Sequence, residues 1–311
     1  MKISVIVPFL NEAENLRNFQ QILSDYLKGQ IYTYKLEVIF VNDGSSDNSV
    51  EILKNNKIKD VESKIVSLSK NFGSHSALRA GIFNSTGDFI MFLYADLQDP
   101  INLIGCLVEK LTEGVEIIWA NRRNTKSKLS ERLFSSWYSK LMKQFAISNY
   151  PEKGFDVVMF SRKVANTLNN DIQVNSSIFL QILSFGYKQD FIEYDKIQRK
   201  NGKSKWTISK KIKLLIDSFV AFSFAPIRLV TIVGFTLFLG GIFFSAYLLF
   251  RKVFFHDLVS GWTMLMTTLS LGFGITNISL GIIAEYLWRT FDAARGRPAF
   301  IIDEIIDLNN E

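Results

Sequence analysis

The chain has 311 residues, 48% of them hydrophobic, and a formal net charge of +6 at pH 7. Its length suits one sizeable α/β core with an additional segment, and its single cysteine, Cys106, excludes an intrachain disulfide. The basic residues gather near the apolar C-terminal segments and between residues 122 and 143, which favours an anionic membrane surface and a phosphorylated substrate over nucleic acid.

Short apolar runs alternate with helical patterns over the first hundred residues. Strands are predicted at residues 4–8, 36–41, 64–68 and 89–94, with helices opening at 11–16, near Ser49 and at 77–81. Parallel neighbours require crossover connections, so this alternation predicts a mostly parallel, doubly wound sheet, which binds ligands at the carboxyl ends of its strands. The sequence contains no P-loop and no Gly-x-Gly-x-x-Gly pattern, which argues against ATP hydrolysis and dinucleotide redox chemistry.

Polar side chains stand where two of these strands end. Asp43 and Gly44 follow the second strand, and Asp96, Gln98 and Asp99 follow the fourth. The second group offers hard oxygen ligands, which suit Mg²⁺ or Mn²⁺ that also holds a diphosphate. A carboxylate at Asp43 suits a hydrogen bond to a base or a ribose hydroxyl. Either cluster is also compatible with an ordinary strand exit, in which Asp43 caps a helix.

Two amphipathic helices are predicted after a further apolar run at 115–119. The first covers 129–148, where large apolar residues recur every four positions and Arg132 and Lys140 lie among them; the second covers 206–219. Basic residues beside tryptophan and tyrosine favour helices in the plane of a membrane surface, although packing on the protein core explains the first pattern equally. Cys106 lies in an apolar helical pattern and is predicted to be a core residue.

Two long stretches near the C-terminus, 229–250 and 258–284, contain no charged side chain. Each exceeds the roughly 20 residues that a helix needs to cross a bilayer. Two in tandem favour a transmembrane hairpin, with spans at 229–250 and 262–287, over buried globular helices. More basic residues flank the hairpin than lie in its connection, which predicts cytoplasmic termini. The first residues show no signal-peptide pattern, so the domain before the hairpin is expected in the cytoplasm.

Five motifs occur in order along the chain, at residues 8–12, 41–47, 69–73, 95–100 and 201–206. Their sequences resemble those of family 2 inverting glycosyltransferases: Pro-Phe-Leu-Asn-Glu, Val-Asn-Asp-Gly-Ser-Ser-Asp, Ser-Lys-Asn-Phe-Gly, Ala-Asp-Leu-Gln-Asp-Pro and Asn-Gly-Lys-Ser-Lys-Trp. The most similar branch makes polyprenyl-phosphate sugars and includes dolichol-phosphate mannose synthases and bacterial polyprenyl-phosphate glycosyltransferases. The resemblance covers nearly the whole chain and implies a nucleotide-diphospho-sugar transferase (GT-A-like) fold and a tetramer.

The resemblance also implies roles for individual residues. The nucleotide would be held by Pro8, Asn11, Glu12, Asp43, Ser69 and Asn71. Asp96 and Gln98 would hold the metal, Mg²⁺ or Mn²⁺, and with it the donor diphosphate. Asp156 lies in the acceptor region, although it is also compatible with a simple turn, and the basic loop at 201–205 is also compatible with a solvated charge run. The candidate catalytic residues are thus Asp96, Asp156, Arg122, Lys203 and Lys205, and the candidates for the acceptor phosphate are Arg122, Arg132 and Lys205.

Two positions depart from the family pattern. Tyr94 stands where the Asp-x-Asp metal motif has its first aspartate, and Asn42 replaces one of the paired aspartates of the uridine site. A phenol stays protonated at neutral pH and is a poor ligand for a hard cation. We therefore expect weaker metal binding than in members that have both aspartates.

These patterns predict four parts: a cytoplasmic glycosyltransferase domain (1–200), a juxtamembrane loop and amphipathic helix (201–228), a transmembrane hairpin (229–287) and a cytoplasmic tail (288–311). The predicted activity transfers one sugar, with inversion, from a nucleotide-diphosphate sugar such as a UDP-sugar to undecaprenyl phosphate at the inner cell membrane, for cell-envelope glycosylation. The predicted partners are the donor, the lipid phosphate, the bilayer and further copies of the chain, and not nucleic acid. Two alternatives stay open: a processive polysaccharide synthase subunit, although the chain lacks Gln-x-x-Arg-Trp, and a catalytically silent nucleotide-sugar-binding membrane protein.

Overall fold

The computed structural model divides the chain into two compact units, Met1–Leu215 with Pro298–Glu311, and Ile216–Arg297. The residues that the structure describes are 1–28, 34–58, 61–123, 129–147, 150–151, 155–173, 176–197, 217, 220, 222–223, 225–255 and 261–309.

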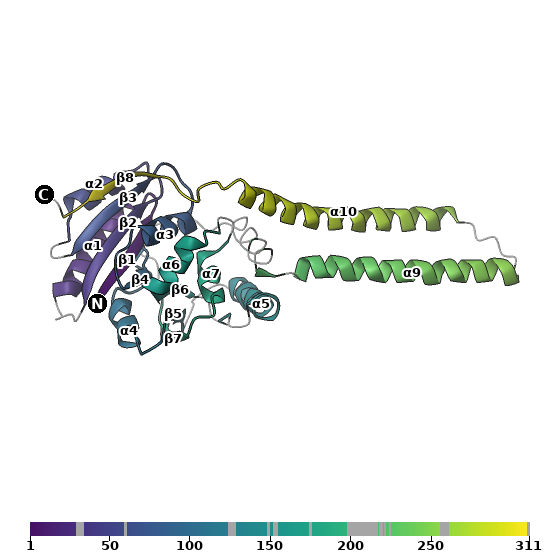
Figure 1. Ribbon diagram of the computed structural model, residues 1–311, viewed down its shortest axis with the longest axis horizontal. Coiled ribbons are helices and arrows are strands. Elements are labelled where there is room, and N and C mark those ends of the chain that lie inside the picture. Colours follow the sequence, from purple (N-terminus) through teal and green to yellow (C-terminus); the bar gives the residue numbers. More distant parts are fainter. Residues whose placement is uncertain are drawn as a thin grey trace. The chain divides into compact units, whose positions relative to one another are not determined.

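The first unit is built on an eight-stranded mixed sheet formed by its described residues (Figure 1). Its order is β7-β5-β6-β4-β1-β2-β3-β8. The strands are β1 (Lys2–Phe9), β2 (Lys35–Asn42), β3 (Glu62–Leu68), β4 (Phe89–Phe92), β5 (Ile117–Arg122), β6 (Phe155–Ser161), β7 (Gln189–Tyr194) and β8 (Ile302–Asp307). The predicted parallel pairing of the first four strands is confirmed, because β1 pairs in parallel with β2 and β4, and β2 with β3. β6 runs antiparallel to β4 and β5, and β8 antiparallel to β3.

Helices cover both faces of this sheet. The helices of this unit are α1 (Ala13–Lys28), α2 (Ser49–Asn55), α3 (Ser74–Phe83), α4 (Leu103–Glu109), α5 (Leu129–Phe145), α6 (Arg162–Asn170) and α7 (Ile178–Ser184). Phe19 of α1 packs edge-on against Phe40 of β2 in the core cluster on one face. On the other face, a Cβ added to Gly81 of α3 would lie 2.3 Å from Cγ2 of Ile6, so glycine allows α3 to lie close to β1.

Two expectations are revised by these elements. Cys106 was predicted to be a core residue, which is wrong: it is exposed on α4, whose buried residues are Leu103, Ile104 and Leu107. The helical period turns position 106 away from the core although its neighbours are apolar.

The segment 288–311, for which only a tail was predicted, contributes β8 to the edge of the sheet beside β3 (Figure 1). The preceding residues also contact this unit: Ser69 N–H donates to Ile301 O at 3.0 Å, and the rings of Phe83 and Phe300 pack with centroids 6.3 Å apart. β8 carries Asp303, Glu304 and Asp307, and charged side chains are usual on an edge strand.

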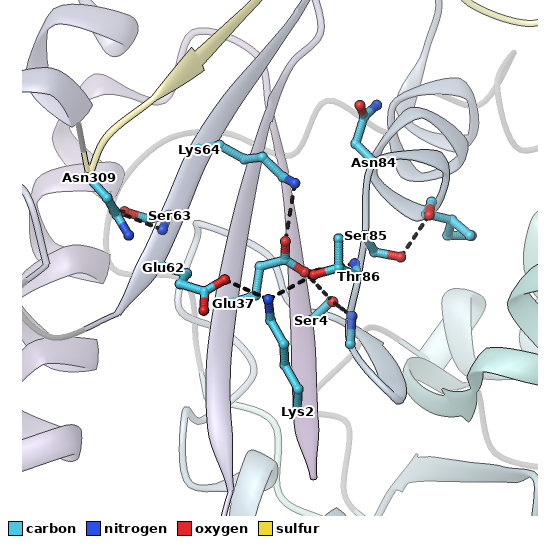
Figure 2. A network of polar contacts seen from close by, with 12 residues as sticks. Lys2, Ser4, Glu37, Glu62, Ser63, Lys64, Asn84, Ser85, Thr86 and Asn309 are labelled. Carbon is cyan, nitrogen blue, oxygen red and sulfur yellow. Dashed lines mark hydrogen bonds and ion pairs between the residues drawn. The ribbon is translucent and has the colours of Figure 1, made fainter.

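A buried polar network joins the amino-terminal halves of the central strands (Figure 2). Glu37 of β2 is 4% exposed, and its Oε2 accepts hydrogen bonds from the Ser4 hydroxyl at 2.5 Å and from Thr86 N–H at 2.9 Å. Its Oε1 lies 3.1 Å from Lys64 Nζ. Burial raises the pKa of the Glu37 carboxyl, but these hydrogen bonds and Lys64 outweigh it, so the pKa is lowered overall. The network holds in place the turn that leads into β4.

The second unit contains two long helices, α9 (Ala225–Phe255) and α10 (Trp262–Ala294). Among the described residues, one helix segment, Ala225–Phe244, is long and apolar enough to cross a membrane by length and composition. Arg289 of α10 pairs with Asp217 at 2.6 Å and with Glu285 at 2.9 Å, which ties the chain before α9 to the C-terminal part of α10.

Candidate functional site

Four of the five sequence motifs meet at one edge of the sheet. β4, β1, β2 and β3 are neighbours and run in parallel, so their carboxyl ends lie side by side. The motifs at 8–12, 41–47, 69–73 and 95–100 stand at the ends of these strands. The fifth motif, which contains Lys203 and Lys205, lies outside the described residues.

Asp43 connects the end of β2 to the 69–73 loop. Its Oδ1 accepts a hydrogen bond from Phe72 N–H at 2.8 Å and its Oδ2 one from Gly73 N–H at 3.0 Å. The residue is 5% exposed, and this burial raises the pKa of its carboxyl in spite of the two N–H donors. The neighbouring Gly44 has φ +76, and a Cβ there would lie 2.7 Å from the carbonyl carbon of Lys70. Asp43 therefore anchors a loop on which Ser69 and Asn71 are exposed.

The loop after β1 is bonded to the loop after β2. Asn11 has φ +51, its N–H donates to Ser45 Oγ at 3.0 Å, and its Oδ1 accepts from Ser46 N–H at 2.8 Å. Glu12 N–H donates to Ser49 Oγ at 3.1 Å, and Pro8 is buried in β1. The residues predicted to hold a nucleotide are thus brought together from three neighbouring strands.

The turn after β4 presents Asp96 and Gln98, both half-buried. Between them Leu97 has φ +56, a left-handed backbone that costs a non-glycine residue about 1–3 kcal/mol. Leu97 and Asn11 are the non-glycine residues with positive φ in the described part of the chain, and both lie in these motifs. Such strain is concentrated at functional sites and persists where the surroundings hold it.

The oxygens of this turn fit a hard divalent cation. Asp96 Oδ1 accepts a hydrogen bond from Gln98 N–H at 3.3 Å, and Asp96 makes no ion pair with any described residue. Among the described residues, no three or more His, Cys, Asp or Glu side chains are grouped so that they could hold a metal ion by themselves. The chain offers one carboxylate and one amide, so phosphates and water would complete the coordination, as is usual for Mg²⁺.

Asp99, the third oxygen-bearing residue of this stretch, is buried in the protein interior, whereas Asp96 and Gln98 are half-buried. It is 2% exposed, accepts a hydrogen bond from the Tyr194 hydroxyl at 2.5 Å and lies 3.6 Å from Lys196 Nζ. Sequence reasoning missed Tyr194 and Lys196, because 95 residues separate Asp99 from Tyr194 and no local pattern links them.

The basic candidates are only partly described. Arg122 is the half-buried last residue of β5, and Arg123 after it pairs with Glu193 at 3.4 Å. Asp156 lies near the start of β6, which is antiparallel to β5 and pairs Phe155 with Asn121, so its backbone reaches the same edge of the sheet. The backbone of Arg132 belongs to α5, and the side chains of Asp156 and Arg132 lie outside what the structure describes.

The chain is similar in sequence to known glycosyltransferases. A family model described as "Glycosyl transferase family 2" matches residues 4–168. The chain is 32% identical over 309 residues to the bactoprenol glucosyl transferase of Shigella phage SfX, covering 97% of this chain and 99% of the relative. It is 30% identical over 312 residues to the uncharacterized glycosyltransferase YkcC of Bacillus subtilis, covering 100% and 96%.

A solved structure of glucosyl-3-phosphoglycerate synthase from Mycobacterium tuberculosis, in complex with Mn²⁺, uridine-diphosphate and phosphoglyceric acid, aligns with a TM-score of 0.45 at 17% identity. The alignment covers 70% of this chain and 76% of that one. The family model matches more than half of the chain, and the relatives cover nearly all of it. The chain belongs to glycosyl transferase family 2.

Proposed function

We propose that this chain transfers one sugar from a nucleotide-diphosphate sugar to a polyprenyl phosphate, with inversion at the anomeric carbon. The observation that carries the proposal is that four of the motifs lie together at the carboxyl ends of neighbouring strands, in a chain similar over nearly its full length to bactoprenol glucosyl transferases. A UDP-sugar is the proposed donor and undecaprenyl phosphate the proposed acceptor.

The nucleotide end of the donor is proposed to lie on the loops after β1, β2 and β3. Asp43 acts there chiefly by holding the backbone of Phe72 and Gly73, because both its oxygens are already bonded to them. Asn11 and Asn71 are then the candidates to contact the nucleotide, since both residues are exposed. A hydrogen-bonded loop of this kind presents a preformed surface to a ribose or a base.

The diphosphate is proposed to lie over the turn after β4. Asp96 and Gln98 would hold Mg²⁺ or Mn²⁺, which supplies positive charge to the leaving diphosphate when bound. Tyr94 occupies the position of a second carboxylate, so the donor phosphates carry a larger share of the coordination.

The reacting group of the acceptor is a phosphate oxygen that is already largely anionic at neutral pH. It forms a bond to the anomeric carbon while the bond from that carbon to the diphosphate oxygen breaks, and the nucleoside diphosphate leaves. A strong general base is less necessary than for a hydroxyl acceptor, so the main task of the protein is to bring two anions together. Arg122, Arg132, Lys203 and Lys205 are proposed to do this, with Asp156 near the acceptor.

A bilayer anchor is part of the same proposal. The apolar segment Ala225–Phe244 and the second long helix, α10, are proposed to form the transmembrane hairpin at the inner cell membrane, with both termini cytoplasmic. α5 is proposed to lie at the membrane surface, supported by Trp137, which is 53% exposed, and by the exposed Lys140 and Lys143. The chain is also proposed to assemble with further copies of itself.

The test is an assay of purified, detergent-solubilised protein with radiolabelled nucleotide sugars and undecaprenyl phosphate, followed by lipid extraction. We expect label in the lipid phase that mild acid releases as one sugar. A long polymer would favour a processive synthase. Donor binding without transfer to any polyprenyl phosphate would refute the proposal and favour a silent binding protein, the alternative that Tyr94 suggests.

A further inference from the structure

Three contacts tie the turn after β4 to the end of β7. The Tyr194 hydroxyl donates to Asp99 Oδ1 at 2.5 Å, and Lys196 Nζ lies 3.6 Å from the same oxygen. Ile197 N–H donates to Gln98 O at 2.9 Å. Asp99 is 2% exposed, so its carboxyl group is held inside the protein by a hydroxyl from β7 and a cation that follows β7 in the chain.

These contacts act on the strained part of the turn. Leu97, with φ +56, lies between Asp96 and Gln98, and the contacts hold the two residues that follow it. A left-handed leucine persists only where its surroundings determine the backbone. The directions of the Asp96 and Gln98 side chains therefore depend on contacts made by Gln98 and Asp99.

The end of β7 is itself held in place by β5. β7 pairs in parallel with β5, with Tyr194 in register with Arg122. Arg123 N–H donates to Tyr194 O at 2.8 Å. The turn after β4 is thereby joined to the strand end that carries Arg122, although β6 lies between β4 and β5 in the sheet.

We propose that Asp99, Tyr194 and Lys196 form a positioning clasp, which sets the geometry of Asp96 and Gln98 toward a divalent cation and the donor diphosphate. The inference rests on the proposed function for the identity of that ligand. Asp99 is in this view a positioning residue and does not coordinate the metal, although it lies in the same short run of oxygen-bearing side chains.

The test compares Tyr194→Phe with the matched control Tyr187→Phe in the full-length, detergent-solubilised protein. Tyr187 also makes a hydroxyl contact, 2.9 Å from Thr167 Oγ1, but it lies away from the turn. UDP binding is measured by calorimetry over a series of Mn²⁺ concentrations. We expect Tyr194→Phe to raise the half-saturating Mn²⁺ concentration about tenfold, while metal-free UDP binding and the thermal unfolding midpoint change no more than in the control.

A second readout uses neither metal nor nucleotide. Backbone hydrogen exchange of a peptide covering residues 97–99 should become faster in Tyr194→Phe and stay unchanged in Tyr187→Phe. If the wild-type protein bound no UDP with Mn²⁺, the proposed function would fail, and the exchange measurement would still decide whether the clasp orders the turn. Unchanged exchange together with an unchanged Mn²⁺ requirement would overturn the clasp.

A double-mutant cycle separates positioning from coordination. Asp99→Ala and Tyr194→Phe both remove the hydrogen bond between Tyr194 and Asp99, so the effect of Tyr194→Phe on the Mn²⁺ requirement should disappear in the Asp99→Ala background. Additive effects, with Asp99→Ala the larger by far, would show that Asp99 acts independently of Tyr194, as a metal ligand would, and would contradict the proposal.

Discussion

Aspartates that are alike in the sequence have different surroundings in the fold. Asp43 and Asp99 are 5% and 2% exposed and are bonded to backbone N–H groups and to a tyrosine hydroxyl, respectively. Asp96 is half-buried and accepts a local hydrogen bond from Gln98 N–H, two residues along the chain. Of the three, Asp96 is the least buried; Asp43 holds the backbone of the 69–73 loop, and Asp99 is held by the side chains of Tyr194 and Lys196.

Replacing Asp96 should remove activity and leave the fold intact. We expect Asp96→Ala to lower sugar transfer by about two to three orders of magnitude, the range seen when one electrostatic stabiliser of a transition state is removed. The measurement is the lipid-extraction assay, with thermal unfolding as the check on folding. Asp25→Ala, at an exposed carboxylate of α1, is the control and should keep full activity. Full activity in Asp96→Ala would contradict the site.

The lowered pKa of the Glu37 carboxyl predicts that this residue stabilises the folded protein in a pH-dependent way. Its pKa in the folded protein is lowered from 4.5, so the stabilisation is present above that value and is lost as the pH falls through the folded-state pKa. Glu37→Gln should therefore destabilise the protein by about 1–3 kcal/mol at pH 7, because the partners Ser4 and Lys64 stay in place around an uncharged group.

Thermal unfolding of the wild type and Glu37→Gln at pH 7 and at acid pH tests this expectation. The difference between the two proteins should shrink as the solution becomes more acidic than the folded-state pKa of Glu37. Glu62→Gln serves as the control, since Glu62 is 59% exposed in its pair with Lys2 and should have little effect at either pH. A constant difference across the pH range would mean that packing, and not charge, accounts for the loss.

At the scale of elements, the site depends on loops that are held against each other. The loop after β1 is bonded to the loop after β2, and the 69–73 loop is bonded to Asp43. Ser69 is held in addition by Ile301, in the segment that leads into β8. The three loops thus form one surface at the carboxyl ends of β1, β2 and β3.

Gly44 is the position where this packing is closest. Gly44→Ala should destabilise the protein and weaken UDP binding, because a Cβ would lie 2.7 Å from the Lys70 backbone and φ is +76. Gly186→Ala is the matched control, since φ there is +70 but nothing lies within 4 Å of the added carbon. We expect Gly44→Ala to be about 1–3 kcal/mol less stable than the control and to bind UDP roughly tenfold more weakly, measured by thermal unfolding and calorimetry. Equal effects of the two substitutions would mean that backbone strain alone matters.

At the scale of the whole molecule, the single cysteine reports on membrane orientation. Cys106 is exposed on α4 in the first unit. If that unit is cytoplasmic, a membrane-impermeant maleimide should leave Cys106 unlabelled in intact cells and label it in inside-out vesicles. Cys106→Ser is the control for other reactions of the reagent. Labelling of Cys106 in intact cells would contradict the proposed orientation.

Much of the fold could be predicted because its strands and helices depend on short, continuous stretches of sequence. Short β-branched runs between helical patterns lead to parallel strands, and parallel strands bring their carboxyl ends to one edge, so the grouping of Asp43 with Asp96 follows from order alone. The motifs point to the family for the same reason, since each is a continuous stretch of sequence.

Only the tertiary structure decided which partner each aspartate side chain has. Asp99 and Asp96 are three positions apart, yet Asp99 is drawn into the protein by Tyr194 and Lys196, contacts that no local pattern contains. The exposure of Cys106 and the return of Ile302–Asp307 to the sheet depend in the same way on which surfaces are already covered. Residue types and their order thus determined the sheet and the grouping of the motifs at one of its edges, whereas burial and long-range contacts decided that Asp96 stays half-buried while Asp99 is buried against Tyr194 and Lys196.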